Sequence, residues 1–225
     1  MNRQAEPEIM NGYRQVCAYA EADFSIPNQM FVDLFKENFP ELSTGKILDL
    51  GCGPADIPLR FARHYPQCSV VGVDGADRML EFGRQNIAAQ GLDKRVKLIH
   101  GSLPHVDLPK NHFSTIISNS LLHHLHDPLV LWQAISFCGK KNAAVLVMDL
   151  FRPSSTTAAA RIVSKYASTE PKILQDDFYN SLLAAYSPSE VREQLERAGL
   201  NNLKVSLISD RHFIVVGYLK KQQYD

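Results

Sequence analysis

One short segment constrains the fold of this chain more than any other, and it reads Lys46-Ile47-Leu48-Asp49-Leu50-Gly51-Cys52-Gly53-Pro54-Ala55. An apolar run that ends near an acid, followed by two glycines around one small residue, predicts a buried parallel strand, a tight turn and a helix from about Ala55. Because glycine lacks a Cβ, backbone N–H groups in such a turn can approach a ligand closely. A second acid, Asp74, ends the next apolar run, and an acid about 20 residues downstream suits hydrogen bonds from a ribose. Together these features predict a site for a nucleoside cofactor.

The bulk properties indicate one large α/β domain. The chain has 225 residues, a formal net charge of zero and no basic block, which argues against a dedicated nucleic-acid surface. Its apolar stretches are far shorter than the ~20 residues that span a bilayer, and the first eight residues are polar, without a signal-peptide core. The cysteines, which are Cys17, Cys52, Cys68 and Cys138, show neither zinc-ligand nor disulfide spacing. We therefore expect a cytoplasmic protein with no membrane partner and no metal.

Short strands alternate with helical segments, which is typical of a largely parallel sheet with helices on both faces. The expected strands are Lys46–Leu50, Ser69–Asp74, Val96–His100, Phe113–Ser118 and Ala143–Asp149, followed by a terminal hairpin of Leu203–Ile208 and His212–Leu219. The expected helices are Ala55–His64, Ala76–Gln90, Pro128–Phe137 and Pro188–Ala198. We expect residues 1–225 to form a single domain.

Two additions to this domain are expected. Residues 1–42 are predicted to form a mostly helical N-terminal cover. Residues 151–185 form an insertion with helical stretches at about Ser154–Ala167 and Asp176–Ala185, broken at Pro171, and with an acid pair expected to cap the second stretch. An insertion after the carboxyl end of a strand is typical of a substrate lid, and a helical pair that only covers the sheet edge is the alternative.

The residues around the two glycines discriminate between nucleoside cofactors. A nicotinamide site favours a small residue at the sixth position of G-x-G-x-x-G, where this chain has Asp56, whose carboxylate would repel a pyrophosphate. Asp49, two residues before the first glycine, would also repel a diphosphate but suits an ammonium or sulfonium group. The segment therefore favours a cationic cofactor.

At these residues the chain resembles the class I S-adenosylmethionine-dependent methyltransferases. Their first motif, (D/E)-x-G-x-G-x-G, is matched by Asp49, Gly51 and Gly53, with Ala55 in place of the third glycine. Segments similar to the later motifs follow in order at Val73–Leu80, Ile99–Pro104, Ser118–Leu125 and Tyr186–Leu200. The resemblance implies a seven-stranded Rossmann-like sheet, mostly parallel with a terminal antiparallel hairpin, in the order 3-2-1-4-5-7-6, with helices on both faces and a helical lid.

The resemblance also implies S-adenosyl-L-methionine as the cofactor. The expected binding residues are Asp49, Gly51, Cys52, Gly53, Asp74, Gly75, Met79, Gly101, Ser102, Leu103 and Asn119. Asp74 would bind the ribose hydroxyls, and Met79 would pack on the adenine. Ser102 stands where the family usually has an acid, so either its hydroxyl or the Leu103 N–H would reach the adenine amino group.

Methyl transfer from a sulfonium needs mainly positioning and desolvation, with a general base where the acceptor carries a proton. His124 and His123 are the candidate bases, and lining the cofactor pocket or satisfying nearby backbone groups is their alternative role. Metal binding by these neighbouring histidines is disfavoured by their spacing. Arg152, after the fifth strand, would either hold a substrate carboxylate or phosphate or lie at the surface.

The expected function is methyl transfer to a small molecule, with no nucleic-acid partner. The alternatives are a catalytically silent regulatory subunit that binds S-adenosylmethionine, a nicotinamide oxidoreductase and an aminopropyl transferase. The identity of the acceptor, the atom that is methylated and the oligomeric state stay open, with a homodimer as one option.

Overall fold

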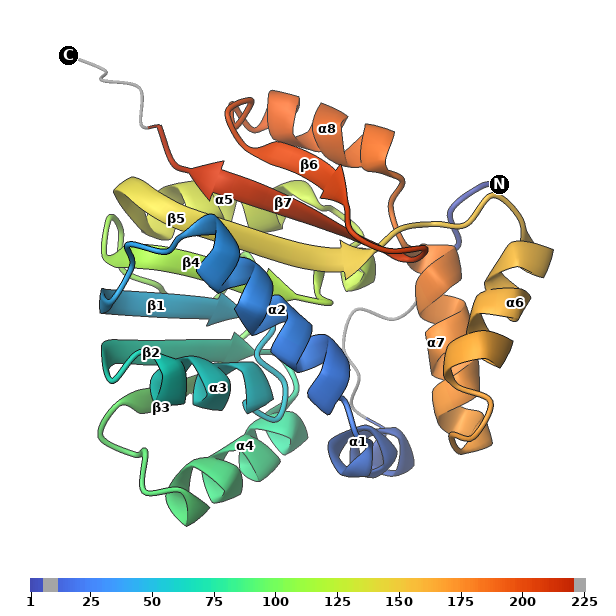
Figure 1. Ribbon diagram of the computed structural model, residues 1–225, viewed down its shortest axis with the longest axis horizontal. Helices are drawn as coiled ribbons and strands as arrows, with labels where there is room; N and C mark the ends of the chain where they lie inside the picture. The colour runs from blue at the N-terminus through green and yellow to red at the C-terminus, as the bar shows by residue number, and fades with distance from the viewer. Residues whose placement is uncertain (6–11, 221–225) are drawn as a thin grey trace.

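The computed structural model describes residues 1–5 and 12–220, with only the backbone at residues 20 and 21. Within these residues seven strands form one sheet in the order β3-β2-β1-β4-β5-β7-β6 (Figure 1). They are β1 (Thr44–Leu50), β2 (Gln67–Asp74), β3 (Val96–His100), β4 (Phe113–Asn119), β5 (Gly139–Leu150), β6 (Lys204–Leu207) and β7 (His212–Tyr218). β7 runs antiparallel to β5 and β6, and the other neighbours pair in parallel. The expected strand order is confirmed.

Helices cover both faces of the sheet because the strand side chains alternate between two apolar layers. Ile47 and Leu48 of β1 are both almost fully buried, yet they belong to separate hydrophobic clusters, since successive strand residues point to opposite faces. The layer around Ile47 includes α2 (Ser25–Asn38), α3 (Asp56–His64) and α4 (Asp77–Ala89). The layer around Leu48 includes α5 (Leu129–Cys138) and α8 (Pro188–Arg197).

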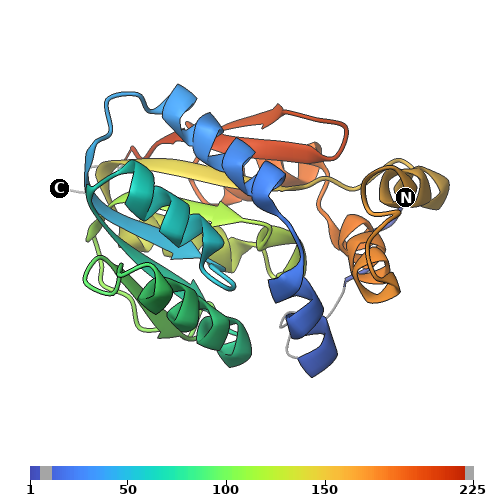
Figure 2. The same cartoon turned by 60° about the horizontal axis from the view of Figure 1, so that its bottom comes forward.

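The two additions meet at the carboxyl edge of the parallel strands. α1 (Tyr13–Glu21) and the pair α6 (Thr156–Tyr166) and α7 (Lys172–Ala184) lie beyond this edge, on the right in Figure 1 and again in Figure 2. Gln15 Nε2 of α1 donates a hydrogen bond to Asp177 Oδ1 of α7 at 2.9 Å. The N-terminal cover and the insertion therefore contact each other on the side of the sheet where α/β folds bind ligands.

The second helix of the insertion begins earlier than the sequence predicted. α7 starts at Lys172, with Pro171 at its N-cap, so the expected start at Asp176 and the expected capping role of the acid pair are wrong. Asp176 instead pairs with Lys172 one turn away, and Asp177 faces α1. Proline suits the start of a helix because its missing N–H would have no helical partner there, and this signal outweighs the acids.

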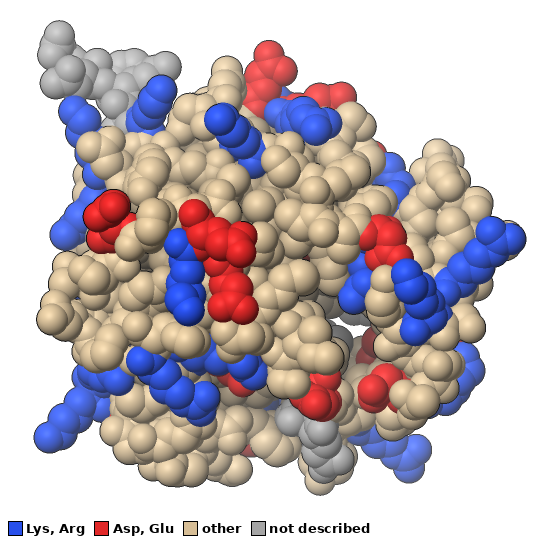
Figure 3. Space-filling view, viewed as in Figure 1, with Lys and Arg blue, Asp and Glu red and all other residues tan. Residues whose placement is uncertain are grey.

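The surface shows no extended region of one charge on the face drawn in Figure 3, where acidic and basic side chains are interspersed. Among the described residues, no helix has both the length and the apolar character that crossing a membrane requires.

Candidate active site

The turn between β1 and α3 is held in shape by the neighbouring strand. Gly51, Gly53 and Ala55 all have positive φ values, of 78°, 52° and 66°. The N–H groups of Gly51 and Cys52 donate to the Val73 carbonyl oxygen of β2 at 2.8 and 3.0 Å. Glycine adopts such φ values without steric cost, whereas Ala55 adopts one while fully buried, which explains why the family pattern places a third glycine there.

Asp74 connects this turn to the turn that follows β2. Its carboxylate accepts the backbone N–H of Gly53 and that of Ala76, each at 2.8 Å. Burial raises the pKa of the Asp74 carboxyl, and these two N–H donors act in the opposite direction. Asp74 therefore orders the backbone on both sides of the site, and its contact with a ribose stays a prediction.

Asp49 is a buried acid to which no described residue donates a hydrogen bond. It is 1% exposed, and both of its carboxylate oxygens lack a donor among the residues that the structure describes. Burial, with a smaller contribution from the charge of Asp74, raises its pKa well above the ordinary value. An unpaired buried carboxylate is costly, so this position suits a ligand that brings a positive charge.

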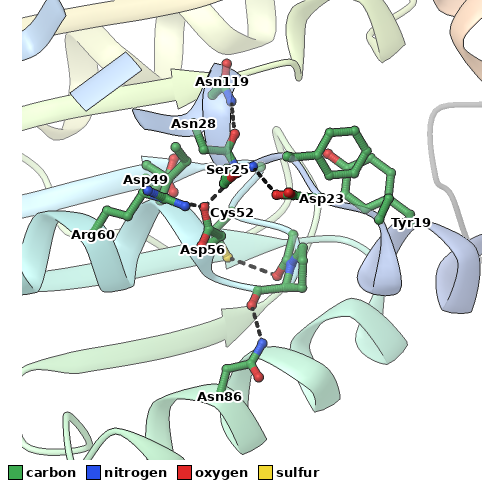
Figure 4. Close-up of a pocket in the computed structure, with 16 residues that line it drawn as sticks. Tyr19, Asp23, Ser25, Asn28, Asp49, Cys52, Asp56, Arg60, Asn86 and Asn119 are labelled. Atoms are coloured by element: carbon green, nitrogen blue, oxygen red, sulfur yellow. Dashed lines mark hydrogen bonds and ion pairs between the residues drawn. The ribbon is translucent and has the colours of Figure 1, made fainter. Parts of the chain in front are cut away.

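A cavity of about 200 Å³ opens at Asp49, between the glycine turn and the start of α2 (Figure 4). Five of the predicted cofactor residues line it, and they are Asp49, Gly51, Cys52, Gly53 and Asn119. The Asn119 amide donates to Asn28 Oδ1 at 3.4 Å, and its own Oδ1 is buried without a donor in the described part of the chain. The cavity thus contains three buried acceptor oxygens from two side chains.

Sequence reasoning missed three side chains that contact one another in the lining of this cavity. Asp56 accepts hydrogen bonds from Asn28 Nδ2 at 2.8 Å and from Arg60 Nε at 2.6 Å, and all three residues line the cavity. The spacing of four residues between Asp56 and Arg60 on one helix was a detectable signal. The contribution of Asn28 was not detectable, since only the tertiary fold brings α2 to the glycine turn.

The residues predicted for the adenosine half of the cofactor do not line this cavity, and α1 covers part of them. Met79 is buried in a small cluster with Val16 and Ala76, against which Tyr19 packs. Burial raises the pKa of Tyr19 to about 12, with the nearby charges of Asp74 and Asp56 adding to the effect. The structure therefore places an N-terminal helix on the residue expected to contact adenine.

The remaining predicted adenosine residues lie around the end of β3. The Gly101 N–H donates to the Asp74 carbonyl oxygen at 2.9 Å, and the Gly75 carbonyl lies 3.1 Å from the His100 ring. Ser102 is exposed, while Leu103 is half-buried against the apolar layer of α5 and α8. These positions flank Asp74, and their contact with a cofactor stays a prediction.

His123 and His124 lie on the short 3₁₀ turn η1 (Leu122–His124) after β4. The ring of His123 is buried, with Nδ1 2.5 Å from Asp149 Oδ1, and its backbone N–H donates to Asp149 Oδ2 at 3.3 Å. Burial alone would raise the pKa of Asp149, but the charge and hydrogen bond of His123 outweigh it and lower this pKa. His124 is half-buried, with its ring centroid 4.1 Å from that of His123. Neither histidine lines the cavity at Asp49, so their catalytic role stays a prediction.

Arg152 is held by protein groups, and its contact with a substrate stays a prediction. Its guanidinium donates to Glu190 Oε1 at 2.8 Å and to the Ala185 carbonyl oxygen at 3.0 Å, and the side chain is 10% exposed. This arginine joins the end of the insertion to the start of α8. Among the described residues there is no group of three His, Cys, Asp or Glu side chains that could hold a metal ion.

The comparisons with known proteins agree with this geometry. A family model described as a methyltransferase domain matches residues 47–136. The demethylmenaquinone methyltransferase of Geobacillus stearothermophilus is 29% identical over 110 residues, which are 48% of this chain and 47% of the relative. The chain spans between about a third and a half of the length of the first curated relatives that it matches.

Solved structures show the same fold. An S-adenosylmethionine-dependent methyltransferase from Aquifex aeolicus superposes with a TM-score of 0.67 at 18% identity, over 92% of this chain and 99% of the other. Phosphoethanolamine N-methyltransferase 2 of Haemonchus contortus, in complex with S-adenosyl-L-methionine, gives 0.68 at 14% identity, over 86% of this chain and 53% of the other. The motif order, the strand order and the domain match lead to one conclusion. The chain has the fold of S-adenosylmethionine-dependent methyltransferases, and its residues 47–136 match a methyltransferase domain.

Proposed function

We propose that this protein transfers the methyl group of S-adenosyl-L-methionine to a small-molecule acceptor. The observation that carries the proposal is the buried carboxylate of Asp49, whose two oxygens have no donor in the described structure. Together with Asn119 Oδ1 it offers three acceptor oxygens inside one cavity, and an ammonium group carries three N–H donors. The methionine part of the cofactor bears such a group in addition to its cationic sulfonium.

The residues of this chain fit the cofactor at two further points. A Cβ added at Gly53 would meet no atom within 4 Å, so the backbone there is open to a ligand in the cavity. The Asp74 carboxylate uses each oxygen once for a backbone N–H, which leaves lone pairs for the hydroxyls of a ribose.

When bound, S-adenosyl-L-methionine supplies an activated methyl group for in-line displacement by an acceptor atom with a free lone pair. Asp49 and Asn119 hold the amino-acid part, and Asp74 with the glycine turn holds the ribose. α1 and the insertion reduce the access of water from the carboxyl edge of the sheet. His124 takes the proton where the acceptor carries one.

The acceptor is proposed as a small molecule on two grounds. The names of the similar proteins mention demethylmenaquinone and phosphoethanolamine, which are different kinds of small acceptor. The chain also has zero net charge and interspersed surface charges on the face shown in Figure 3, which disfavours a nucleic-acid substrate.

The first experiment is calorimetry with S-adenosyl-L-methionine, its demethylated product and a nicotinamide dinucleotide, on the wild type and on Asp49→Asn. We expect binding of the first two ligands only, and a large loss in Asp49→Asn. Asp33→Asn is the matched control, since Asp33 is exposed on α2 and does not line the cavity at Asp49. Binding of the dinucleotide alone would replace the proposal with an oxidoreductase.

A second experiment separates an enzyme from a silent subunit. The protein is incubated with S-adenosyl-L-methionine and fractionated small-molecule extracts, and the demethylated cofactor is measured by mass spectrometry. Demethylated cofactor that forms only with one fraction, and does not form with Asp49→Asn, supports an enzyme. Cofactor binding without product in any fraction favours the regulatory subunit.

A further inference from the structure

Arg3 lies between the turn η1 and the end of α7 and contacts both. Its Nε donates to the Ala184 carbonyl oxygen at 2.5 Å, and its Nη2 donates to the carbonyl oxygens of His123 at 2.8 Å and Leu125 at 3.1 Å. The guanidinium carbon also lies 4.1 Å from the centre of the Tyr186 ring. One arginine near the start of the sequence therefore contacts three carbonyl groups from two elements more than 50 residues apart.

These carbonyl groups need donors from outside their own elements. Ala184 is the last residue of α7, and the final carbonyl groups of a helix have no partner within the helix. The 3₁₀ turn is only three residues long, so the carbonyl groups of His123 and of the turn's C-cap, Leu125, lie past the hydrogen bonds of the turn. A guanidinium supplies several N–H donors in a planar fork, keeps its charge, and is favoured at a helix C-terminus by the helix dipole.

Two adjacent contacts extend this arrangement. The backbone N–H of Gln4 donates to the Leu183 carbonyl oxygen at 3.0 Å, so the chain next to Arg3 is also tied to α7. Tyr186, under the guanidinium, donates its hydroxyl to the Leu125 carbonyl oxygen at 2.7 Å. The segment around Arg3 thus joins the insertion to the histidine turn from outside.

We propose that Arg3 is a positioning residue that couples the insertion to the histidine turn on the acceptor side of the site. Asp149 fixes the ring of His123, and Arg3 fixes the carbonyl of the same residue, so the turn is held from both sides. His124 is the next residue along, and its place relative to an acceptor depends on this backbone. The consequence of this inference for methyl transfer rests on the proposed function.

The contacts of Arg3 are separate from those expected of the methyl donor. The residues that Arg3 touches do not belong to the set that lines the cavity at Asp49. Loss of Arg3 should therefore disturb the histidine turn and the end of α7 while donor affinity stays unchanged. This separation distinguishes a positioning role from a general loss of folded structure.

The experiment compares Arg3→Ala and Arg3→Lys with Arg95→Ala in the full chain. Arg95 is the matched control because its guanidinium donates to the carbonyl oxygens of Ala62 at 2.6 Å and Tyr65 at 3.4 Å, just before β3 at the opposite edge of the sheet. Hydrogen exchange is measured at the amides of residues 121–126 and 180–185. The low-field imidazole proton shared by His123 and Asp149 is followed by NMR, and S-adenosylhomocysteine binding by calorimetry.

In Arg3→Ala we expect exchange at both segments to accelerate roughly tenfold or more, with the imidazole signal broadened or shifted. Arg3→Lys should lie between the wild type and Arg3→Ala, since lysine keeps the charge but not the fork. Arg95→Ala should leave both segments and the signal unchanged. Unchanged exchange in Arg3→Ala, or an equal change in Arg95→Ala, would overturn the inference.

Calorimetry separates this inference from the proposed function. If wild-type protein fails to bind S-adenosylhomocysteine, the proposed function fails, whatever the exchange data show. If Arg3→Ala also binds S-adenosylhomocysteine more weakly than the wild type, Arg3 does not act on the acceptor side alone, and that part of the inference is wrong.

Discussion

Gly53 donates its backbone N–H to the Asp74 carboxylate at 2.8 Å, which connects the turn after β1 to the end of β2. The other oxygen of Asp74 accepts the N–H of Ala76 at the same distance. The acid expected to bind a ribose therefore already organises the two backbone segments around it. Substitution of Asp74 should therefore weaken ligand binding and also change the backbone conformation of the site.

Replacing Asp74 tests this double role. We expect Asp74→Ala to weaken S-adenosylhomocysteine binding by about 2 kcal/mol or more, because buried hydrogen bonds to a charged group are lost. Asp74→Asn should lose less, since its amide oxygen still accepts one N–H. Calorimetry measures the affinity, with Asp77→Ala as the control, because Asp77 is exposed and 3.8 Å from Arg84. Equal affinity in Asp74→Ala and the wild type would remove Asp74 from the site.

Gly53→Ala separates backbone strain from obstruction of the ligand. Both Gly53 and Gly91 have positive φ and room for a Cβ, so alanine at either position should lower the free energy of unfolding by about 1 kcal/mol. Only Gly53 lines the cavity, so only Gly53→Ala should also lose donor affinity. Chemical denaturation and calorimetry on the two variants check this difference. If Gly91→Ala lost affinity equally, strain rather than obstruction would explain the effect.

A substitution at Gly51 tests folding instead of ligand obstruction. A Cβ there would lie 2.8 Å from Leu121 Cβ, on a backbone with φ of 78°. Gly51→Val places a branched side chain at this position. The structure shows that the added side chain would first collide with Leu121.

The unfolding free energy should depend on pH through Asp49. Its pKa is raised in the folded protein by burial and by Asp74, so above the ordinary value of 3.8 the folded state binds more protons than the unfolded state. The stability that the protonated form contributes is therefore lost as the pH rises from 3.8 to the folded-state pKa of Asp49. We expect Asp49→Asn to flatten this slope and to stabilise the protein at pH 7 by about 1 kcal/mol or more.

Urea denaturation at pH 5 and pH 8 checks the Asp49 prediction. Part of the dependence of the unfolding free energy on pH should persist in Asp49→Asn, because burial also raises the pKa of Asp74. Asp49→Asn should at the same time lose donor binding. A variant that was both less stable at pH 8 and still able to bind the donor would contradict the assignment.

The pair of His123 and Asp149 should change the free energy of unfolding with pH in the direction opposite to that expected for Asp49. The pKa of Asp149 is lowered in the folded protein, so its contribution to stability is present above 3.8 and is lost as the pH falls through the folded-state pKa. Because both side chains are buried, Asp149→Asn should reduce the free energy of unfolding by roughly 3–5 kcal/mol. Asp210→Asn is the control, since it removes an exposed ion pair with Lys165 and should have a much smaller effect. Denaturation at pH 7 measures both variants.

His124→Ala tests the catalytic prediction separately. If His124 is the base, turnover should fall by roughly 10²–10⁴-fold while donor affinity and stability change little. Turnover is measured with the acceptor fraction that the extract screen identifies, over a range of pH. His126→Ala, at an exposed position just after the turn, serves as the control. Unchanged turnover in His124→Ala would leave the histidines with a structural role only.

The sequence alone determined the strands and the turn of the site, because their signals are local, whereas the strand order was implied by the family resemblance. Apolar runs such as Val70–Val73 fix strands, and the glycines after Leu50 fix the turn, since only residues without a bulky Cβ tolerate positive φ there. The paired acids Asp49 and Asp74 indicated a cationic nucleoside before any contact was known. These features depend on neighbours within a few residues, so they are readable along the chain.

The tertiary structure decided what the polar side chains do. Arg152 pairs with Glu190 and His123 pairs with Asp149, and these partners lie 38 and 26 residues away along the chain. Asn28 and Arg3 carried no local signal, and they reach the site region only because the start of α2 and the first residues lie at the carboxyl edge in the folded chain. A hydrogen bond is specified by the position of both partners, and for partners so far apart in the sequence only the folded chain provides it.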